Sequence, residues 1–456
     1  MNRFEVKSTL AGFDWPAFPT AIGAQLLALQ WQMQESQWWP KQTLEEHQFT
    51  QLDRLFQFAR IHTPFYQSFY RDLDVKGPLT ASNFRQLPIL RREIIQQAKG
   101  KFVSQDLPPQ YGRLMKLSSS GSTGRPIEVY KNEVNDYMSK VFTLRDHLWH
   151  NRDITRRFAA IRHSPEQAYQ APEGKRSPSW TQATAEMFVT GPSYRLDSMA
   201  PTSEQLDWLL VCQPDYLMTY PSNLRALIQQ TERMGRLPSS LRQVITFGEL
   251  LPPSLRAELR ERWQIDLTDT YSCQEAGVLA LQCPEHEHYH VQAENVLLEV
   301  LNDKDEACQV GEVGRVVLSS LHNFASPLLR YEVGDYAEVG ACCDCGRGLP
   351  VLKRIYGRAR NMVKYPNGDT AWPYLGGSGY FSDVVNINQF QIVQTQSDTL
   401  DMYLVMDREM TKIQQSGLTD KIRSALRYPF KLNFIYVDAI ARGTTGKFED
   451  FISKVV

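Results

Sequence analysis

The sequence lacks several features that would assign its class early. Its 456 residues contain no run of the roughly eighteen apolar residues that a membrane-spanning helix needs. The N-terminus has no apolar core of signal-peptide type before charges and prolines interrupt it. A basic excess is also absent, since 50 Lys and Arg face 51 Asp and Glu, a formal charge of -1. We therefore expect a cytoplasmic protein whose overall charge does not attract it to nucleic acid or to an anionic membrane.

Cysteine is scarce and odd in number, with seven residues in the chain. In a reducing compartment, clustered cysteines indicate metal binding sooner than disulfides. Three sulfurs and one imidazole would make a closed tetrahedral zinc site of the structural type. These four donors are Cys283, His290, Cys343 and Cys345. The competing ligands are Cys342, His286 and His288. Buried or surface cysteines without a metal are the alternative.

The chain is too long for one compact core, so we expect at least two domains. Hydrophobic residues at 42% and charged residues at 22% are typical of a soluble globular protein. Residues 1–110 have mostly helical patterns, whereas helices and strands alternate over 203–275, which predicts a parallel α/β layer. After about residue 290, short strands separated by Gly and Asp turns predict a β-rich subdomain.

The last hundred or so residues have a different pattern, which predicts a separate α+β unit. Two strands, 389–396 and 399–407, flank Ser397-Asp398 as a hairpin, and a helix that begins at Asp420 is predicted to end before Pro429. The fold class is therefore α/β, with a large multi-subdomain N-terminal domain and a small C-terminal domain. The boundary is predicted near 357–361.

A run of small and hydroxyl residues lies in the first third of the chain. It reads Ser119, Ser120, Gly121, Ser122, Thr123, Gly124 and Arg125. Small residues let backbone N–H groups converge on an anion, and the hydroxyls and the arginine add donors and charge. No Gly-Lys-Ser/Thr closes the run, so it is not a Walker-type loop. A flexible linker has a similar composition, but strand patterns at 113–117 and 127–131 flank this run and favour an anion-binding loop.

The run, followed by Pro126, resembles the Ser-Ser-Gly-Thr-Thr-Gly-Lys-Pro loop of the adenylate-forming superfamily, in its phenylacetate–CoA ligase-like branch. Further matches follow in the same order from about residue 54 to 456: ARIHTPFY, LPIL, TYPSNL, FGELL, TYSCQEAG, LLRYEVGD, IYGRARN and GTTGKF. One such motif would be weak, but the ordered series is hard to obtain by chance. The resemblance implies an adenylation domain over 1–356 and a mobile C-terminal domain over 357–456.

The resemblance also implies a nucleotide site. The loop 119–125 corresponds to the cradle for the β- and γ-phosphates of ATP. Gly248 and Glu249 match the turn that lines adenine. Asp335 corresponds to the acceptor of hydrogen bonds from the ribose hydroxyls, and Arg358 to a contact with ribose or phosphate.

Catalytic roles follow from the same resemblance. Tyr271 corresponds to a ring that packs on adenine, and Gln274-Glu275 to the motif whose glutamate helps to hold Mg²⁺. Lys447 matches the C-terminal lysine that bridges the substrate carboxylate and the α-phosphate. Each residue taken singly has an ordinary structural explanation, as a surface carboxylate, a core ring or a solvated turn. Their joint occurrence favours function.

Three positions depart from the family pattern. Ser272 and Gln274 replace the glycine and the hydroxyl residue between Tyr271 and Glu275. Arg360-Asn361 stands where relatives have an acidic hinge pair, and the next glycine, Gly368, comes late. These changes bear on the thioester-forming half of the reaction, because that half requires the C-terminal domain to rotate.

We therefore expect an ATP- and Mg²⁺-dependent ligase that forms an acyl-AMP and then transfers the acyl group. The acid is expected to be small and aromatic or apolar, in a pocket near Tyr220-Pro221 and Phe247-Gly248. CoA is the first acceptor by resemblance, and a carrier-protein thiol or an amine is the alternative. A catalytically silent nucleotide-binding scaffold, a zinc-stabilised interaction module and a homodimer all stay open.

Overall fold

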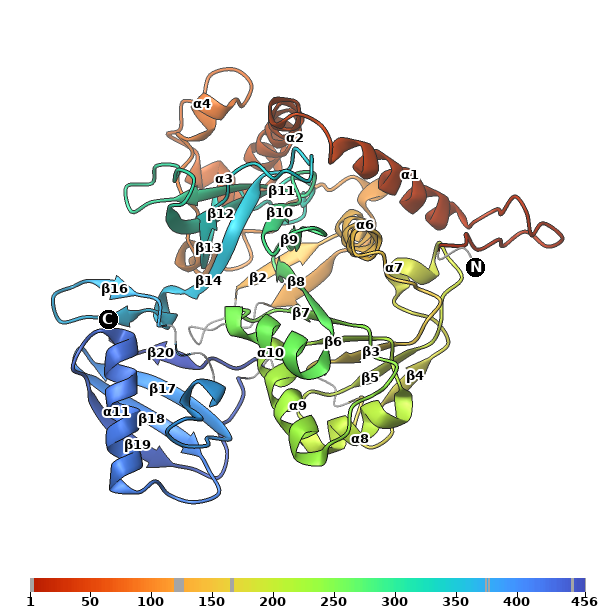
Figure 1. The fold of residues 1–456 in the computed structure, drawn as a ribbon. Helices are drawn as coiled ribbons and strands as arrows, with labels where there is room; N and C mark the ends of the chain where they lie inside the picture. The colour runs from red at the N-terminus through yellow and green to blue at the C-terminus, as the bar shows by residue number, and fades with distance from the viewer. Residues whose placement is uncertain are drawn as a thin grey trace.

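The computed structural model describes residues 4–118, 127–164, 168–373, 375, 378–443 and 447–455. Figure 1 shows a large N-terminal part and a smaller C-terminal part, coloured blue, beside it. The helices are α1 (Ala21–Ser36), α2 (Lys41–His62), α3 (Pro64–Phe69), α4 (Ala81–Phe84), α5 (Arg92–Gln97), α6 (Glu133–Trp149), α7 (Gln182–Ala185), α8 (Thr202–Cys212), α9 (Pro221–Met234), α10 (Pro253–Trp263) and α11 (Lys412–Leu426). Short 3₁₀ turns cover Pro109–Tyr111, Ala359–Asn361 and Ser378–Phe381.

One large sheet runs through the N-terminal part. Its strands lie in the order β11 (Val296–Leu301), β12 (Val313–Ser320), β13 (Tyr331–Val339), β14 (Val351–Arg358), β10 (Tyr289–Val291), β9 (Gly277–Gln282), β8 (Asp266–Cys273), β7 (Gln243–Phe247), β6 (Tyr216–Thr219), β3 (Phe158–Ile161), β5 (Ser193–Leu196) and β4 (Lys175–Ser177). The expected parallel α/β layer and the expected β-rich region are both present, as two halves of this sheet.

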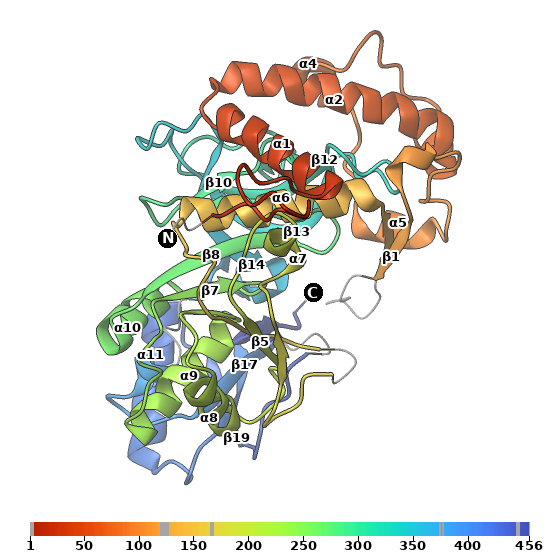
Figure 2. The same cartoon turned by 90° about the vertical axis from the view of Figure 1, so that its right-hand side faces the viewer.

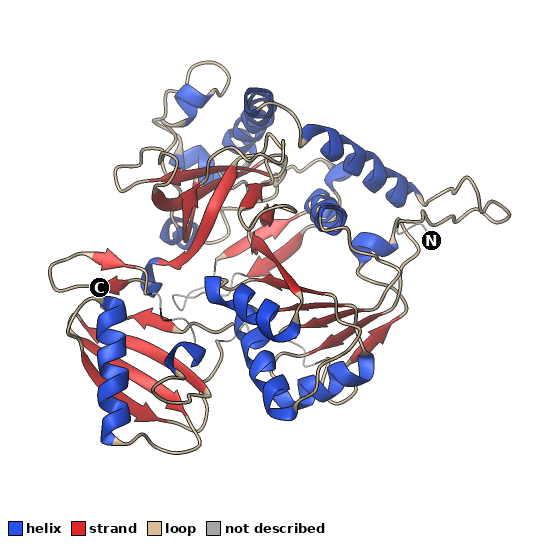
Figure 3. Ribbon diagram, viewed as in Figure 1, coloured by secondary structure: helices blue, strands red, loops and turns tan. Residues whose placement is uncertain are grey.

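The parallel half contains β5, β3, β6, β7 and β8. Alternate residues of β3 enter two different cores: Ala159 and Ile161 pack with α8, α9 and α10, whereas Phe158 and Ala160 pack with α1 and α6. Figure 3 shows helices on both sides of these strands. A parallel sheet needs cover on both faces, which explains why every residue of β3, FAAI, is apolar and buried.

The sheet changes direction after β8. The turn over 274–276 sends β9 back antiparallel to β8, and antiparallel pairs continue to β11. The long helix α2 and the short helices that follow it share a core with this antiparallel half. In Figure 2, α1, α2 and α6 lie together in the upper part of the view, above the parallel strands β5 and β7.

The C-terminal part has its own sheet and its own core. The strands lie in the order β19 (Lys431–Tyr436), β18 (Thr399–Val405), β17 (Gln389–Gln396) and β20 (Phe451–Ser453). The predicted hairpin is confirmed as the antiparallel pair β17 and β18. Helix α11 packs on this sheet through Leu418, Ile422 and Leu426.

The predicted start of that helix at Asp420 is wrong, because α11 begins at Lys412. The helix ends before Pro429 as predicted: its last residue is Leu426, because Arg427 adopts a left-handed conformation with φ +51°. The predicted boundary between 356 and 357 falls inside β14 and stays a prediction.

Two short hairpins complete the fold. They are β1 (Met115–Ser118) with β2 (Glu128–Lys131), and β15 (Val363–Lys364) with β16 (Thr370–Ala371). Across the described ranges, no helix is both long and apolar enough to cross a membrane.

Candidate active site

The carboxyl ends of the parallel strands carry the residues expected to line the nucleotide and acid pockets. Tyr220 follows β6, and Gly248 follows β7. The rings of Tyr220 and Phe247 lie with centroids 5.0 Å apart. In open α/β sheets, ligands bind outside this edge of the strands. The fold therefore brings the predicted acid-pocket residues to the edge where a ligand would bind.

Tyr271 on β8 and Asp335 on β13 meet although three strands separate them in the sheet. Flat strands would lie about 19 Å apart at the usual spacing of about 4.8 Å. Instead the Tyr271 hydroxyl donates a hydrogen bond of 2.9 Å to Asp335, so the sheet must curl strongly. Arg358 lies opposite Asp335 on β14, with its Nε 3.6 Å from Oδ1.

Burial shapes the electrostatics of this group. It raises the pKa of Asp335, and the Arg358 guanidinium opposes the shift. Burial also raises the pKa of Tyr271 well above its ordinary value, with Asp335 adding to the effect. The phenol therefore stays protonated and acts as a donor to the carboxylate.

Glu275 lies in the turn between β8 and β9, and its side chain is buried. Arg92, in the first turn of α5, approaches it with Nη1 3.8 Å from Oε1. Lys131 at the end of β2 is the second cation of this region. Burial lowers the pKa of Lys131, and Glu275 is among the groups that oppose the shift. Gln274 is exposed at the same turn.

Lys447 reaches this region from the far end of the chain. Gly248 has φ +76°, and a Cβ atom there would lie 3.3 Å from Cε and 3.5 Å from Nζ of Lys447. Burial lowers the pKa of Lys447, with Arg358 acting in the same direction, whereas Glu249, Asp335 and Glu275 oppose it. Residues from four separate segments thus surround one lysine.

Glu249 contacts both parts of the molecule. Its Oε2 accepts a hydrogen bond of 2.9 Å from the backbone N–H of Ser222, and its Oε1 accepts one of 3.0 Å from the Ser222 hydroxyl. The same Oε1 accepts a hydrogen bond of 2.8 Å from the N–H of Phe448. Burial raises the pKa of Glu249. Its predicted place in the adenine-lining turn stays a prediction.

The hinge position is also bound to the segment that carries Lys447. Arg360 pairs with Glu449 at 2.7 Å, and Asn361 donates hydrogen bonds to Glu449 and to the carbonyl of Phe451. The departure from an acidic hinge pair is therefore matched by an acidic partner on the opposite segment.

The predicted phosphate loop, 119–125, lies outside the described residues. The strands expected on either side of it are present as β1 and β2, which pair antiparallel. Sequence reasoning missed Arg92 and Ser222 as members of this region. Both lie in or beside motifs that the resemblance contains, LPIL and TYPSNL, so the signal was present.

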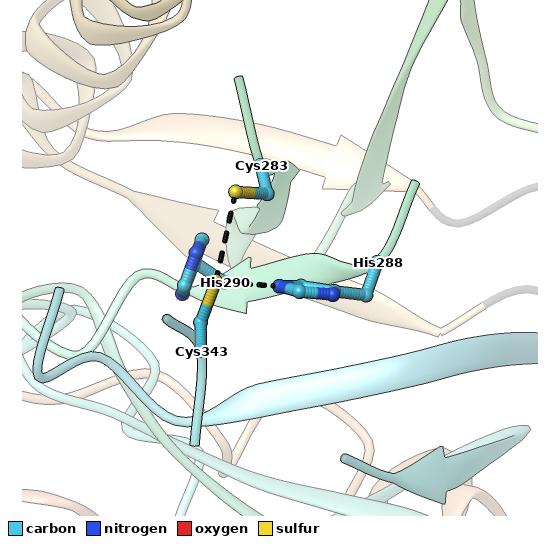
Figure 4. A group of neighbouring side chains, drawn as sticks. All are labelled: Cys283, His288, His290 and Cys343. Carbon is cyan, nitrogen blue, oxygen red and sulfur yellow. Dashed lines mark hydrogen bonds between the residues drawn. The ribbon is translucent and has the colours of Figure 1, made fainter. Parts of the chain in front are cut away.

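The predicted metal ligands also come together, away from this site (Figure 4). Cys283 follows β9, His288 and His290 lie at β10, and Cys343 and Cys345 lie in the loop before β14. Donor atoms of four residues all lie within 4.8 Å of one another. These four are Cys283, His288, His290 and Cys343.

Individual distances describe this cluster further. Cys343 Sγ lies 3.9 Å from Cys283 Sγ and 3.1 Å from His288 Nε2. Cys345 Sγ lies 3.4 Å from His290 Nε2. Among the competing ligands, His288 therefore joins the cluster.

The loop that contains Cys343 also contacts the N-terminal helices, through Arg347. The guanidinium of Arg347 lies 4.7 Å from the ring centroid of Trp38 and 4.6 Å from that of Trp149. Its Nε donates a hydrogen bond of 3.0 Å to the Gln37 side chain. The cluster, α6 and the junction of α1 with α2 therefore form one structural unit.

Comparisons with known proteins agree with this geometry. Residues 378–454 match the family described as the CapK C-terminal domain. The phenylacetate-coenzyme A ligase of Thermus thermophilus is 24% identical over 409 residues, 85% of this chain and 87% of that protein. Protein CapK of Staphylococcus aureus is 20% identical over 434 residues, 89% of this chain and 88% of the relative.

A solved 2-hydroxyisobutyryl-CoA ligase in the postadenylation state, in complex with 2-HIB-AMP, superposes with a TM-score of 0.72. That structure is 15% identical and covers 91% of this chain and 90% of its own. The same ligase in the thioesterification state gives a TM-score of 0.61 over 92% of this chain. The arrangement of the two parts is therefore nearer to the first of these states.

The fold defines the class: the chain has the fold of the adenylate-forming ligases. Over most of its length its sequence is similar to a phenylacetate–CoA ligase and to CapK.

Proposed function

We propose that this protein activates a carboxylic acid with ATP, forming an acyl-AMP and pyrophosphate, and then transfers the acyl group to CoA. The observation that carries the proposal is the position of Lys447, whose amine lies against the Gly248 turn. Asp335 and Glu275 act electrostatically on that amine. The names of the relatives, phenylacetate-coenzyme A ligase and 2-hydroxyisobutyryl-CoA ligase, support CoA as the acceptor.

The chemistry requires charge neutralisation and in-line alignment. A carboxylate oxygen attacks the α-phosphorus of ATP, and the bond from that phosphorus to the bridging oxygen of pyrophosphate breaks. Lys447 donates to both the carboxylate and the α-phosphate, so negative charge that develops between them meets a fixed cation. Arg92 and Lys131, on the side of Glu275, supply positive charge toward the departing pyrophosphate. The acyl-AMP then reacts with a thiol at its carbonyl carbon, and AMP leaves.

Glu275 would hold Mg²⁺ in this scheme. Mg²⁺ is usually bound through one or two carboxylates together with substrate phosphate oxygens. The single buried carboxylate of Glu275 fits that pattern. When bound, the ion neutralises phosphate charge, while Asp335 accepts hydrogen bonds from the ribose and the Gly248 turn lines adenine.

The acid is proposed to be small and aromatic or apolar. Tyr220 and Phe247 offer two ring faces at the carboxyl ends of adjacent parallel strands, next to the Lys447 amine. An acid that lies on these rings would direct its carboxylate toward the lysine.

A pyrophosphate-release assay tests the proposal. The purified chain is incubated with ATP, Mg²⁺ and a panel of carboxylic acids, with and without CoA, and the products are identified by mass spectrometry. We expect acid-dependent pyrophosphate release and an acyl-CoA product. Acid-dependent release with no thioester would favour a carrier-protein thiol or an amine as the acceptor. A lack of release with every acid would favour the silent nucleotide-binding scaffold.

We also propose a structural zinc ion in the cysteine and histidine cluster. Zinc binds sulfur at about 2.3 Å and nitrogen at about 2.0–2.1 Å, so the edges of its tetrahedron measure about 3.5–3.8 Å. The separations between Cys343 and Cys283, 3.9 Å, and between Cys343 and His288, 3.1 Å, lie within about 0.5 Å of such edges. So does the separation of 3.4 Å between Cys345 and His290. Five donors compete for four positions, and metal analysis of single variants would identify the four.

A further inference from the structure

The segment that carries Lys447 makes two groups of contacts, and a rotation of the C-terminal part would affect them differently. Its Glu449 is bound to Arg360 and Asn361, which belong to the hinge. Its Phe448 N–H is bound to Glu249, which lies in the N-terminal part. A rotation of the C-terminal part about the hinge would keep the first group near its partners. The same rotation would break the second.

Glu249 is well placed to receive this segment. Its carboxylate lies at the first turn of α9, where Ser222 donates from both its N–H and its hydroxyl. The amino end of a helix presents free N–H groups and a partial positive charge, so a carboxylate there is held in one orientation. The remaining acceptor capacity of Oε1 is aimed at the Phe448 N–H, one residue after the lysine.

A second chain of contacts strengthens the same junction. Arg442, before the lysine, donates a hydrogen bond of 2.9 Å to the Ser222 hydroxyl. On α9, Nη1 of Arg225 lies 3.4 Å from Oδ2 of Asp450, which follows the lysine in the chain. The start of α9 and Glu249 therefore bind the segment both before and after Lys447.

We propose that Glu249, fixed by Ser222, is a positioning residue that docks the 447–450 segment for adenylation and releases it for acyl transfer. This inference rests on the proposed function. It assigns Glu249 a role through Lys447, because its carboxylate contacts the backbone next to that residue. Docking fixes the ammonium at the Gly248 turn, and a displacement of about 1 Å can cost about a hundredfold in rate.

Half-reactions of Glu249→Ala separate this role from two others. We expect acid-dependent ATP–pyrophosphate exchange to fall about tenfold or more at saturating ATP, with little change in KM for ATP. Acyl transfer to CoA from synthetic acyl-AMP should slow far less. A rise in KM for ATP with unchanged kcat would instead make Glu249 an adenine contact and overturn the proposal. Equal losses in both halves together with a lower Tm would mean a purely structural cap of α9.

Glu249→Gln is a milder variant if the alanine variant folds poorly. The amide keeps one acceptor oxygen but cannot accept from both the Ser222 N–H and the Phe448 N–H. Its exchange rate should lie between those of the wild type and Glu249→Ala. The charge-matched control is Glu332→Gln, whose partners Arg91 and Arg315 both lie in the N-terminal part. The control should leave both half-reactions unchanged.

Hydrogen–deuterium exchange tests the docking without any turnover. The Phe448 amide should exchange slowly in the wild type and in Glu332→Gln, and faster in Glu249→Ala. Fast exchange in the wild type, or the same protection in Glu249→Ala, would overturn the proposal. Protection that depends on Glu249 in a chain that releases no pyrophosphate with any acid would support docking while the proposed function fails. The two failures are therefore distinguishable.

Discussion

Replacement of Lys447 by alanine removes a side chain that the C-terminal segment places against the Gly248 turn. The amine is partly buried, and burial lowers its pKa, so it lies where a cation interacts more strongly than at the surface. Loss of one fixed donor to a developing charge costs about a hundred- to a thousandfold in rate, or about 2.7–4 kcal/mol. We expect Lys447→Ala to lower acid-dependent ATP–pyrophosphate exchange by that factor.

The assay needs a control within the same part of the chain. Lys364 on β15 donates a hydrogen bond of 2.6 Å to the Val455 carbonyl, so Lys364→Ala also removes an amine from the C-terminal part. It should leave exchange unchanged within about twofold, since the Lys364 amine bonds to the Val455 carbonyl of its own part of the chain and not to the Gly248 turn. A folded Lys447→Ala protein with exchange near the wild-type rate would refute the role of the lysine.

The pH profile gives a second test of the same residue. Because burial lowers the pKa of Lys447, the free enzyme loses this charge at a lower pH than an ordinary lysine, near 10.4, would. The value of kcat/KM for ATP should therefore fall on the alkaline side, with an apparent pKa below that of an ordinary lysine. Lys447→Arg keeps its charge to higher pH, so its alkaline limb should move upward. Identical limbs in the two proteins would contradict the assignment.

Three further predictions concern stability and metal. Burial lowers the pKa of His147 to about 3, so the unfolded chain takes up this proton first as the pH falls below about 6.5. The free energy of unfolding should drop by about 2 kcal/mol through this group between pH 8 and pH 5, and urea unfolding of His147→Gln should lack that part of the slope. Cys343→Ser should lose bound zinc and show a lower Tm, and an unchanged zinc content would exclude Cys343 as a ligand. Ile422→Ala, fully buried on α11, should cost about 2–5 kcal/mol in unfolding of the C-terminal part. Ile413→Ala, 86% exposed on the same helix, should cost less than about 0.5 kcal/mol, and equal costs would contradict the packing.

Local patterns were enough to predict β6, β7 and β8 of the parallel half, but they did not predict β3 and β5. The strand over 243–247 and the helix ended by Gly235 match β7 and α9, because apolar periodicity and a left-handed glycine act within a few residues. The same apolar periodicity did not predict the first turns of α11. Its early residues are polar apart from the exposed Ile413, and the buried face begins only at Leu418.

Long-range pairing was beyond such patterns. The sequence indicated two kinds of sheet, but the turn over 274–276 joins them into one, and no local signal tells which strand edges meet. The contact of Arg92 with Glu275 likewise depends on how α5 packs against β13. The resemblance singled out Glu275 and Lys447, which the structure brings into one region, because family motifs carry positional information that periodicity does not.

Because the large sheet curls, the cysteine and histidine cluster lies on the strands that connect Tyr271 with Asp335. Between β8, which carries Tyr271, and β13, which carries Asp335, lie β9, β10 and β14, and the cluster is attached to these three strands. The proposed zinc ion would hold these three strands together and so keep Tyr271 and Asp335 at hydrogen-bonding distance. We therefore expect removal of the metal by a chelator to weaken ATP binding at a concentration that leaves the chain folded.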